Sequence, residues 1–387
     1  MFLRELETPV IVVRDAILQK NMKRYQDACN QHGKALWPMV KTHKSTEIAA
    51  LQRNLGAEGF LCGTLDECEA LCAMGARKIM YAYPVAGAVS CRRAVELAKK
   101  CEFYLRLDDL DGAAELNEEA EKQGTELFYT IIVDCGLHRF GRQPEDVAAF
   151  ADEMQRFSYL RFAGISTHCG HVYGEADPAQ VPRYVEDERK AIHTAVDALR
   201  DRGYDVRLVT TGATPTFWGI LEDELVNVCH PGNYVFHDCI QLGNGSAREE
   251  DCALTVCATV ISHPREDLFL CDAGAKCLGL DQGAHGNTSV RGHGRVLGHP
   301  ELQLTDLSEE VGKLHVAGTT DLKVGDRIEI IPNHACSSAN LTDWYVVVDE
   351  NENVKRCVAV DIRANKTYKG FREKGKRPLR IAAAVFS

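Results

Sequence analysis

The feature that most constrains the fold is a regular alternation of short apolar runs with amphipathic stretches through the first part of the chain. Eight apolar runs occur, at residues 35–41, 59–63, 78–83, 102–107, 127–134, 160–168, 206–211 and 225–230. Most are continuously apolar, which is typical of parallel strands buried on both faces. Amphipathic stretches that predict helices lie between them, at residues 65–74, 89–100, 110–123 and 181–202. Eight strand–helix units predict an α/β fold, a (β/α)8 barrel of the TIM type.

A doubly wound sheet is the alternative architecture with the same alternation. It needs fewer units, or a glycine-rich dinucleotide-binding turn after its first strand. The first apolar run is followed instead by Thr42, His43 and Lys44, without a G-x-G-x-x-G motif. The barrel is therefore the favoured architecture.

The second part of the chain has a different character. After about residue 248 helical periodicity fades, and strand-like runs separated by turn residues occupy residues 252–262, 268–272, 327–332, 344–349 and 357–363. The Gly- and His-rich segment 283–294 is interpreted as an exposed loop. With 387 residues the chain is also long for a single core. We expect a barrel over residues 10–248 and a mostly β domain over residues 249–387 together with residues 1–9.

Composition excludes several classes of function. The formal net charge of -11 argues against a nucleic-acid surface. No apolar stretch approaches the length of a membrane span, and the first residues do not resemble a signal peptide. The 16 cysteines are scattered and form no C-x-x-C pair, so buried thiols are expected and a zinc ribbon is not. These features predict a cytoplasmic protein.

Lys41 stands at the end of the first predicted barrel strand. The carboxyl ends of barrel strands face the active site, where low-dielectric walls favour a neutral amine that can attack an aldehyde. The alternative is an ordinary surface lysine. The segment Val-Lys-Thr-His-Lys at residues 40–44 resembles the cofactor-lysine motif of the D-serine dehydratase and D-threonine aldolase family. That family belongs to the alanine-racemase-like enzymes, which combine a barrel with a β domain. The resemblance implies that Lys41 holds pyridoxal 5′-phosphate (PLP) as a Schiff base.

Two further strand ends carry the same resemblance. Residues 134–141, Asp-Cys-Gly-Leu-His-Arg-Phe-Gly, are similar to the family's D-x-G-x-x-R-x-G segment, which implies that Arg139 donates to the phenolic oxygen of PLP. In residues 164–173, the family's pattern implies that His168 packs on the pyridine ring and that Tyr173 lies near the substrate. His168, Cys169 and His171 could alternatively bind a metal. Neighbouring strand residues point to opposite faces, which makes that cluster awkward.

The last two predicted strands are followed by segments rich in small residues. They resemble the family's phosphate loops, which implies phosphate contacts from Thr211, Gly212, Ala213, Thr214, Gly232, Asn233 and Tyr234. Small residues let backbone N–H groups approach an anion, although two tight turns would give the same pattern. His230 precedes the second segment, where racemase relatives have an arginine facing the pyridine nitrogen.

A His-x-Cys pair in the second domain is the most discriminating feature. On an extended segment His334 and Cys336 point to the same side, and such a nitrogen–sulfur pair suits Zn²⁺ with coordination positions left open. A chance pairing is the alternative. In the family this segment is the metal site, and a His-x-Cys pair resembles the D-serine dehydratase branch. The aldolase branch typically has a carboxylate at the second position.

The sequence departs from the family pattern in four places. Trp37 and Met39 stand where arginine and histidine are frequent, and Val311 replaces a frequent histidine. His230 is the fourth departure, as noted above. These differences leave the cofactor prediction in place and leave the substrate open.

The resemblance implies a PLP- and zinc-dependent dehydratase. Lys41 would remove the α-proton of a β-hydroxy D-amino acid, and the metal held by His334 and Cys336 would assist loss of the hydroxyl group, giving a 2-oxo acid and ammonia. D-serine, D-threonine and 3-hydroxy-D-aspartate are the candidate substrates. The alternatives are an aldolase that gives glycine and an aldehyde, a racemase, and a non-catalytic PLP-binding protein. The resemblance also implies a homodimer.

Overall fold

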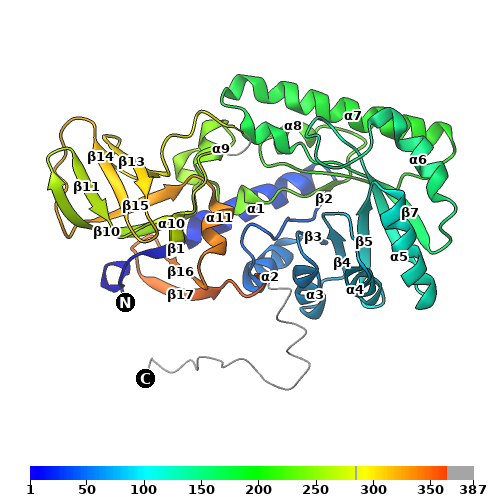
Figure 1. Cartoon of the computed structure of the whole chain (residues 1–387), viewed down its shortest axis with the longest axis horizontal. Coiled ribbons are helices and arrows are strands. Elements are labelled where there is room, and N and C mark those ends of the chain that lie inside the picture. The colour runs from blue at the N-terminus through cyan, green and yellow to red at the C-terminus, as the bar shows by residue number, and fades with distance from the viewer. Residues whose placement is uncertain (284–285, 364–387) are drawn as a thin grey trace, which may run out of the picture.

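The computed structural model describes residues 1–283 and 286–363, and it contains two sheets. An eight-stranded parallel sheet forms the barrel, and a nine-stranded sheet forms a second domain beside it (Figure 1). The helices of the barrel lie outside its strands, as a (β/α)8 architecture requires. The predicted fold class is therefore confirmed.

The barrel strands follow the order predicted from the apolar runs. They are β2 (Ala35–Leu36), β3 (Phe60–Cys62), β4 (Lys78–Tyr81), β5 (Glu102–Leu107), β6 (Leu127–Ile132), β7 (Leu160–Ser166), β8 (Leu208–Thr211) and β9 (Val228–Cys229). The sheet runs from β3 through β4 to β9 and then to β2. A parallel bridge between Met39 and Leu61 joins its two edges and closes the barrel.

The first barrel strand is much shorter than the predicted residues 35–41. Pro38 has no N–H group, so the ladder cannot continue through it. Its carbonyl oxygen accepts instead from Leu61 N at 3.0 Å, and Val40 N donates to Leu61 O at 3.0 Å. The chain around Lys41 is thus bonded to β3 while it leaves regular strand geometry, which places Lys41 in a loop at the mouth of the barrel.

Three of the eight barrel helices named here start at strong capping residues. The eight helices are α1 (Asp15–Gln31), α2 (Thr46–Leu55), α3 (Leu65–Ala73), α4 (Ala88–Ala98), α5 (Leu110–Lys122), α6 (Val147–Met154), α7 (Val181–Asp201) and α8 (Phe217–Ile220). Ser45, Thr64 and Asp109 accept hydrogen bonds from the first turns of α2, α3 and α5. The four predicted helices agree with α3, α4, α5 and α7 to within two residues at each end.

The second domain contains nine strands. They are β1 (Val10–Arg14), β10 (Leu254–Arg265), β11 (Leu268–Cys271), β12 (Gly294–Val296), β13 (Leu302–Leu307), β14 (Gly312–Val316), β15 (Arg327–Pro332), β16 (Trp344–Val348) and β17 (Val354–Ala359). Strand β1 pairs with β10 and β16, which differs from the expectation that the barrel domain starts at residue 10. Its valines fit a sheet buried on both faces as well as they fit a barrel strand. Strands β12, β13 and β14 were not predicted, because they are short and partly exposed.

Three short helices lie where the second domain meets the barrel. They are α9 (Cys239–Gly243), α10 (Ala275–Leu278) and α11 (Ala335–Asn340), and α10 and α11 lie between the nine-stranded sheet and the barrel (Figure 1). The Phe236 and Tyr345 rings meet edge to face at 5.6 Å between the two domains. Tyr345 also donates from its hydroxyl to the His43 carbonyl oxygen at 2.6 Å. This contact ties the second domain to the loop that carries Lys41.

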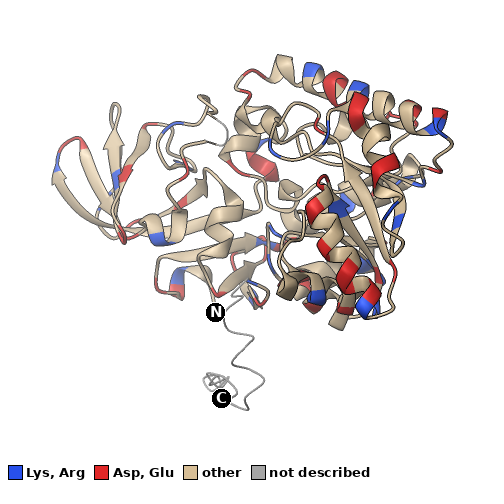
Figure 2. Cartoon of the chain, turned by 45° about the vertical axis from the view of Figure 1, so that its right-hand side comes forward, with Lys and Arg blue, Asp and Glu red and all other residues tan. Residues whose placement is uncertain are grey.

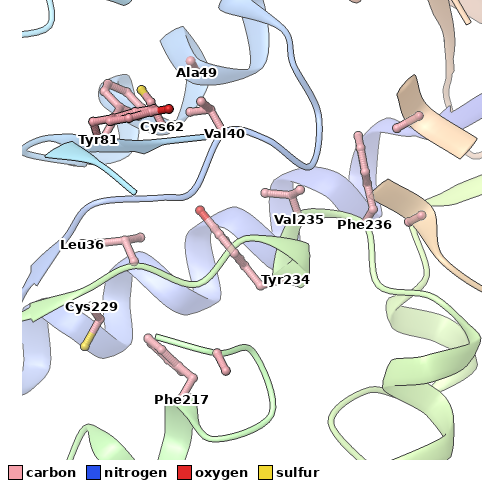
Figure 3. Packing of buried hydrophobic residues seen from close by; sticks show 14 of the residues in the cluster. Leu36, Val40, Ala49, Cys62, Tyr81, Phe217, Cys229, Tyr234, Val235 and Phe236 are labelled. Atoms are coloured by element: carbon pink, nitrogen blue, oxygen red, sulfur yellow. The ribbon is translucent and has the colours of Figure 1, made fainter. Parts of the chain in front are cut away.

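The core of the barrel continues beneath its last strand. Tyr25 on α1 lies 4.4 Å from Phe217 and 4.5 Å from Tyr234, measured between ring centroids. Figure 3 shows Tyr234, Val235 and Phe236 following one another along the chain, with Phe217 on a separate segment below Tyr234. The cluster fixes the course of the chain after β9, where three of the predicted phosphate-binding residues, Gly232, Asn233 and Tyr234, follow.

The surface and the thiols agree with the composition. Lys, Arg, Asp and Glu residues are intermixed over the helices of the barrel, without a single basic face in this view (Figure 2). Within the described residues, no helix is both long and apolar enough to cross a membrane. All 16 cysteines are free thiols, and most are buried.

Gly164 on β7 provides a test of barrel packing. A Cβ atom there would lie 1.9 Å from the Leu208 carbonyl oxygen of β8, and the residue has a φ of +151°. We expect Gly164→Ala to lower the free energy of unfolding by about 3 kcal/mol or more, from backbone strain plus overpacking. Urea unfolding followed by circular dichroism measures the change.

The matched control is Gly203→Ala. Gly203 has a φ of +83°, and a Cβ atom there would meet no atom within 4 Å. The Gly203→Ala variant should lose only the free energy of unfolding that comes from backbone strain, about 1–2 kcal/mol. Equal losses in the two variants would show that close approach of β7 and β8 is unimportant.

Candidate active site

A cavity of about 260 Å³ lies at the carboxyl ends of the barrel strands, beneath the second domain. Ten of the residues predicted from the sequence line it: Lys41, Arg139, His168, Tyr173, Gly212, His230, Gly232, Asn233, His334 and Cys336. A wider cavity adjoins it and shares Lys41, His334 and Cys336. The first cavity therefore has a way out to solvent along the junction of the two domains.

The loop after β2 separates its two lysines. Lys44 has a φ of +47°, and its Nζ pairs with Glu67 Oε1. Glu67 is buried, and its other oxygen accepts from Gly63 N at 2.6 Å. Lys44 is thus neutralised by a buried carboxylate, whereas Lys41 faces the cavity and has no ion pair among the described residues. Of the two, Lys41 is the amine available for chemistry.

Arg139 is presented by a loop that one carboxylate organises. Asp134 Oδ1 accepts from Gly136 N at 2.9 Å and from His138 N at 3.0 Å, and its Oδ2 lies 2.8 Å from His138 Nδ1. Burial alone would raise the pKa of Asp134, but these donors hold it below its usual range. The Arg139 guanidinium lies 5.8 Å from the centroid of the Tyr83 ring, at the cavity wall. The loop thereby holds a fixed cation beside the cavity.

His168 and Tyr173 are both fixed against the loop after β8. His168 Nδ1 lies 2.8 Å from the Gly212 carbonyl oxygen, which can only accept, so Nδ1 carries a proton. Burial and the nearby Lys41 charge hold the pKa of His168 well below its usual range, so its ring is neutral. The Tyr173 hydroxyl accepts from Thr214 N at 3.0 Å. A neutral ring held in this way presents a flat face to a ligand.

The two predicted phosphate segments approach each other closely. A Cβ atom at Gly212 would lie 2.7 Å from the His230 backbone, and one at Gly232 would lie 3.0 Å from Thr42 Oγ1. Thr214 does not line the cavity, and its buried hydroxyl has no hydrogen-bond partner among the described residues. Close backbone suits an anion, so Gly212 and Gly232 fit the phosphate of PLP.

Other members of the predicted phosphate set lie outside the cavity wall. The Thr211 hydroxyl donates to Glu188 Oε1, and Ala213 is buried beside it. The Tyr234 ring lies in the core, and its hydroxyl accepts from Gln52 Nε2 at 2.9 Å (Figure 3). The Tyr234 side chain therefore does not reach the cavity, because its ring packs in the aromatic cluster around Tyr25.

Glu188 on α7 is a fully buried carboxyl group beneath the loop after β8. One oxygen accepts from Thr211, and the other meets no hydrogen-bonding group at bonding geometry within residues 1–283 and 286–363. Burial raises the pKa of Glu188 from 4.5 to about 7, in spite of the hydrogen bond from Thr211, which lowers it. Sequence patterns did not single out this residue, because an acidic residue on an amphipathic helix normally faces water.

Arg106 is a second residue that the sequence analysis missed. It lies in the cavity wall on β5, is 5% exposed, and donates from Nε to Ser166 Oγ at 2.8 Å. Burial lowers the pKa of Arg106 to about 10. Burial of the His230 ring, together with the nearby Arg106 charge, lowers the pKa of His230 to about 3. Both ring nitrogens of His230 are unpartnered. An arginine within the apolar run 102–107 was the signal that could have revealed it.

His334 and Cys336 face the cavity from the second domain, in a geometry that differs from the prediction. His334 is extended, with φ −136° and ψ 101°, but helix α11 begins at Ala335, so Cys336 lies in a helical turn. The two side chains nevertheless line the same cavity, close enough for each to shift the pKa of the other. Burial alone would lower the pKa of His334, but the Cys336 thiolate and Asp281 raise it well above its usual range. Burial alone would raise the pKa of Cys336, but His334 lowers it.

Barrel residues hold this pair in place. Cys336 Sγ lies 3.3 Å from Thr42 Oγ1, next to Lys41 in sequence. Asp238 is fully buried, and its Oδ2 accepts from Ala335 N at 2.9 Å and from Asn233 Nδ2 at 2.5 Å. Asp238 and Thr42 were not predicted, because their partners are distant in sequence.

The alternative metal cluster is not formed. His168 turns to Gly212, while Cys169 is buried and contacts His171 at 3.9 Å. Across residues 1–283 and 286–363, no group of three or more His, Cys, Asp or Glu side chains could hold a metal ion. A metal at His334 and Cys336 would therefore take its other ligands from substrate or water.

Comparison with family models agrees with the two-domain division. The model described as "Alanine racemase, N-terminal domain" matches residues 13–238. The model described as "Putative serine dehydratase domain" matches residues 253–348, which include His334 and Cys336.

Individual relatives cover nearly the whole chain. D-serine dehydratase of Dictyostelium discoideum is 27% identical over 90% of this chain and 95% of its own. D-threo-3-hydroxyaspartate dehydratase of Delftia sp. is 31% identical over 86% of this chain and 92% of its own. The solved structure of the Delftia enzyme superposes with a TM-score of 0.86 at 30% identity, covering 92% of this chain and 98% of that one. A cysteine-to-alanine variant of it is described as the metal-free form. The 3-hydroxy-D-aspartate aldolase of Paracoccus denitrificans is 27% identical over 89% of each.

The buried Glu188 gives a pH-dependent stability. Between pH 4.5 and about 7 the folded protein keeps the Glu188 proton while the unfolded chain releases it, so the free energy of unfolding falls as pH rises. The loss is at most about 3 kcal/mol, from 2.5 pKa units at 1.36 kcal/mol each. Glu188→Gln cannot ionise, so its stability relative to wild type should increase by that order between pH 4.5 and 7.5. Urea unfolding at the two pH values measures it.

The exposed Glu186 on the same helix supplies the control. Glu186→Gln should track wild type at both pH values, since its carboxylate is solvated in the folded and unfolded states. If Glu188→Gln also tracks wild type, the carboxyl group is ionised in the folded protein.

Proposed function

The chain belongs to the alanine-racemase-like, fold-type III family that includes D-serine dehydratase, D-threo-3-hydroxyaspartate dehydratase and D-threonine aldolase, and on this basis we propose that it is a PLP- and zinc-dependent dehydratase of a β-hydroxy D-amino acid. The family consists of PLP-dependent lyases. The observation that carries the finer proposal is the meeting of Lys41, His334 and Cys336 at one cavity. The products would be a 2-oxo acid and ammonia.

The cavity residues fit PLP. Lys41 Nζ is the attachment point, Arg139 is the cation for the phenolic oxygen, and the neutral His168 ring offers a face for packing. Gly212 and Gly232 would let backbone N–H groups approach the phosphate. When bound, PLP withdraws electrons from the α-carbon of the amino acid attached to it. Lys41 Nζ would then accept the α-proton, since it has no carboxylate partner to hold it away.

The second-domain residues fit zinc. His334 and Cys336 provide a nitrogen and a sulfur donor, the ligand types that Zn²⁺ prefers, and they leave coordination positions open. A bound zinc ion would polarise a β-hydroxyl group as a Lewis acid. Cys336 favours the dehydratase over the aldolase, because the family resemblance of this segment implies a carboxylate at the second position in the aldolase branch. The Thr42 contact holds the thiolate next to the Lys41 loop, so acid and base chemistry would share one substrate.

Lys41→Ala tests the cofactor site. We expect the purified variant to lose the visible absorbance of the lysine-bound cofactor, because the covalent link is removed. Absorbance between 400 and 440 nm, about the range of such links, measures it against wild type. Lys276→Ala, at the entrance and paired with Glu310, should keep the band. Retention of the band in Lys41→Ala would refute the assignment.

Product analysis with D-serine, D-threonine and 3-hydroxy-D-aspartate tests the reaction. Ammonia and a 2-oxo acid, lost with a chelator and restored by Zn²⁺, are expected. Cys336→Ala should lose metal and at least about 100-fold of dehydration rate while it keeps the cofactor absorbance. Cys277→Ala, a partly buried thiol of the same domain, is the control. Glycine and an aldehyde as products would instead identify an aldolase.

A further inference from the structure

His334 is held by a carboxylate outside its own segment. Asp281, in the loop after α10, places Oδ1 at 3.2 Å from His334 Nδ1. The two side chains are about one third exposed, 33% for Asp281 and 31% for His334. The Ser337 hydroxyl lies 3.4 Å from the same ring nitrogen. Nδ1 is therefore engaged by the Asp281 carboxylate and the Ser337 hydroxyl.

This contact decides which ring nitrogen remains for a ligand. An ionised carboxylate accepts hydrogen bonds and cannot donate them, so Nδ1 carries the proton and Nε2 is the position left for a metal. In metal sites a carboxylate on the second nitrogen fixes both the tautomer and the orientation of a histidine ligand. We propose that Asp281 is the positioning residue of the metal site, which presents His334 Nε2 to the ion beside Cys336. The proposal rests on the proposed function, since it assumes that these two residues bind a metal.

The backbone of Asp281 is itself tied to the ligand segment. Asn333, which precedes His334, donates from Nδ2 to the Asp281 carbonyl oxygen at 2.8 Å and to the Gly292 carbonyl oxygen at 2.7 Å. Asn333 is buried. One amide thus joins the loop of Asp281 to the residue next to His334, so the carboxylate and the imidazole move as one unit. A surface ion pair lacks such a constraint.

The same domain contains a histidine–carboxylate pair of the ordinary surface kind. His315 Nδ1 lies 3.8 Å from Asp267 Oδ2, with 62% of the Asp267 side chain exposed. Neither residue of this pair lines either of the two cavities described above. This pair also joins a histidine to a carboxylate but lies away from the proposed metal site, which makes it a matched control.

The experiment measures Zn²⁺ affinity of the PLP-loaded protein by competition with a chromophoric chelator. Asp281→Asn should raise the Kd for Zn²⁺ by about 10- to 100-fold, the usual cost of losing such a partner. Asp281→Ala should do the same, and Asp281→Glu, which keeps a carboxylate, should recover part of the loss. The visible bands of Co²⁺ bound to Asp281→Asn should shift from those of wild type. Asp267→Asn should leave both measurements unchanged.

Cofactor absorbance and the melting temperature report whether each variant is folded. If Asp281→Asn and Asp281→Ala bind Zn²⁺ within twofold of wild type, Asp281 does not position the ligand and the inference is overturned while the proposed function stands. If wild type itself binds no Zn²⁺, both fail. A loss in Asp281→Asn equal to that in Asp267→Asn would also overturn the inference, since any carboxylate would then have the same effect.

Discussion

The buried carboxylate of Asp238 is the contact on which the site depends. It belongs to the barrel, yet it accepts from the backbone of Ala335, between the two candidate metal ligands of the second domain. Its two oxygens also accept hydrogen bonds from Asn233 Nδ2 and from Gln241 N in the first turn of α9, so both oxygens have protein donors. A buried charge must be satisfied in this way, and satisfying it fixes the distance between the domains. The Tyr345 contact to His43 reinforces the same junction.

Within that frame the cavity is electrostatically uneven. Arg106 and Arg139 stand in its wall, while His168 and His230 are kept neutral by burial. Of its lining residues only Asp238 carries a carboxyl group, and that group is bonded to other atoms. A ligand with two or more anionic groups is favoured by such a wall, which fits PLP and an amino-acid carboxylate together. In the proposed reaction the base, Lys41, would act from the barrel side, and the metal held by His334 and Cys336 would act from the second domain.

Much of this site can be predicted from the sequence for a physical reason. In a parallel barrel every strand ends at the same rim, so motifs at strand ends converge whatever their separation in sequence. This brought Lys41, Arg139 and His168 to one cavity. The strand pattern could not place Tyr234, whose ring packs with Tyr25 in the core, or show that Cys336 lies in the first turn of a helix. It also missed Asp281, since the Gly- and His-rich segment after it was interpreted as an exposed loop, whereas Asn287 and His293 within it are buried.

The sequence by itself determined the eight-unit barrel, the β-rich second domain and the family, because apolar periodicity and local motifs are properties of neighbouring residues. Only the tertiary structure decided which polar groups meet. Thr42 reaches Cys336 across 294 residues, and Asp281 reaches His334 across 53. It also decided that Glu188 is buried, whereas its helix pattern predicts exposure. Such pairings arise when two domains exclude water from one junction, and no local pattern in the chain records that event.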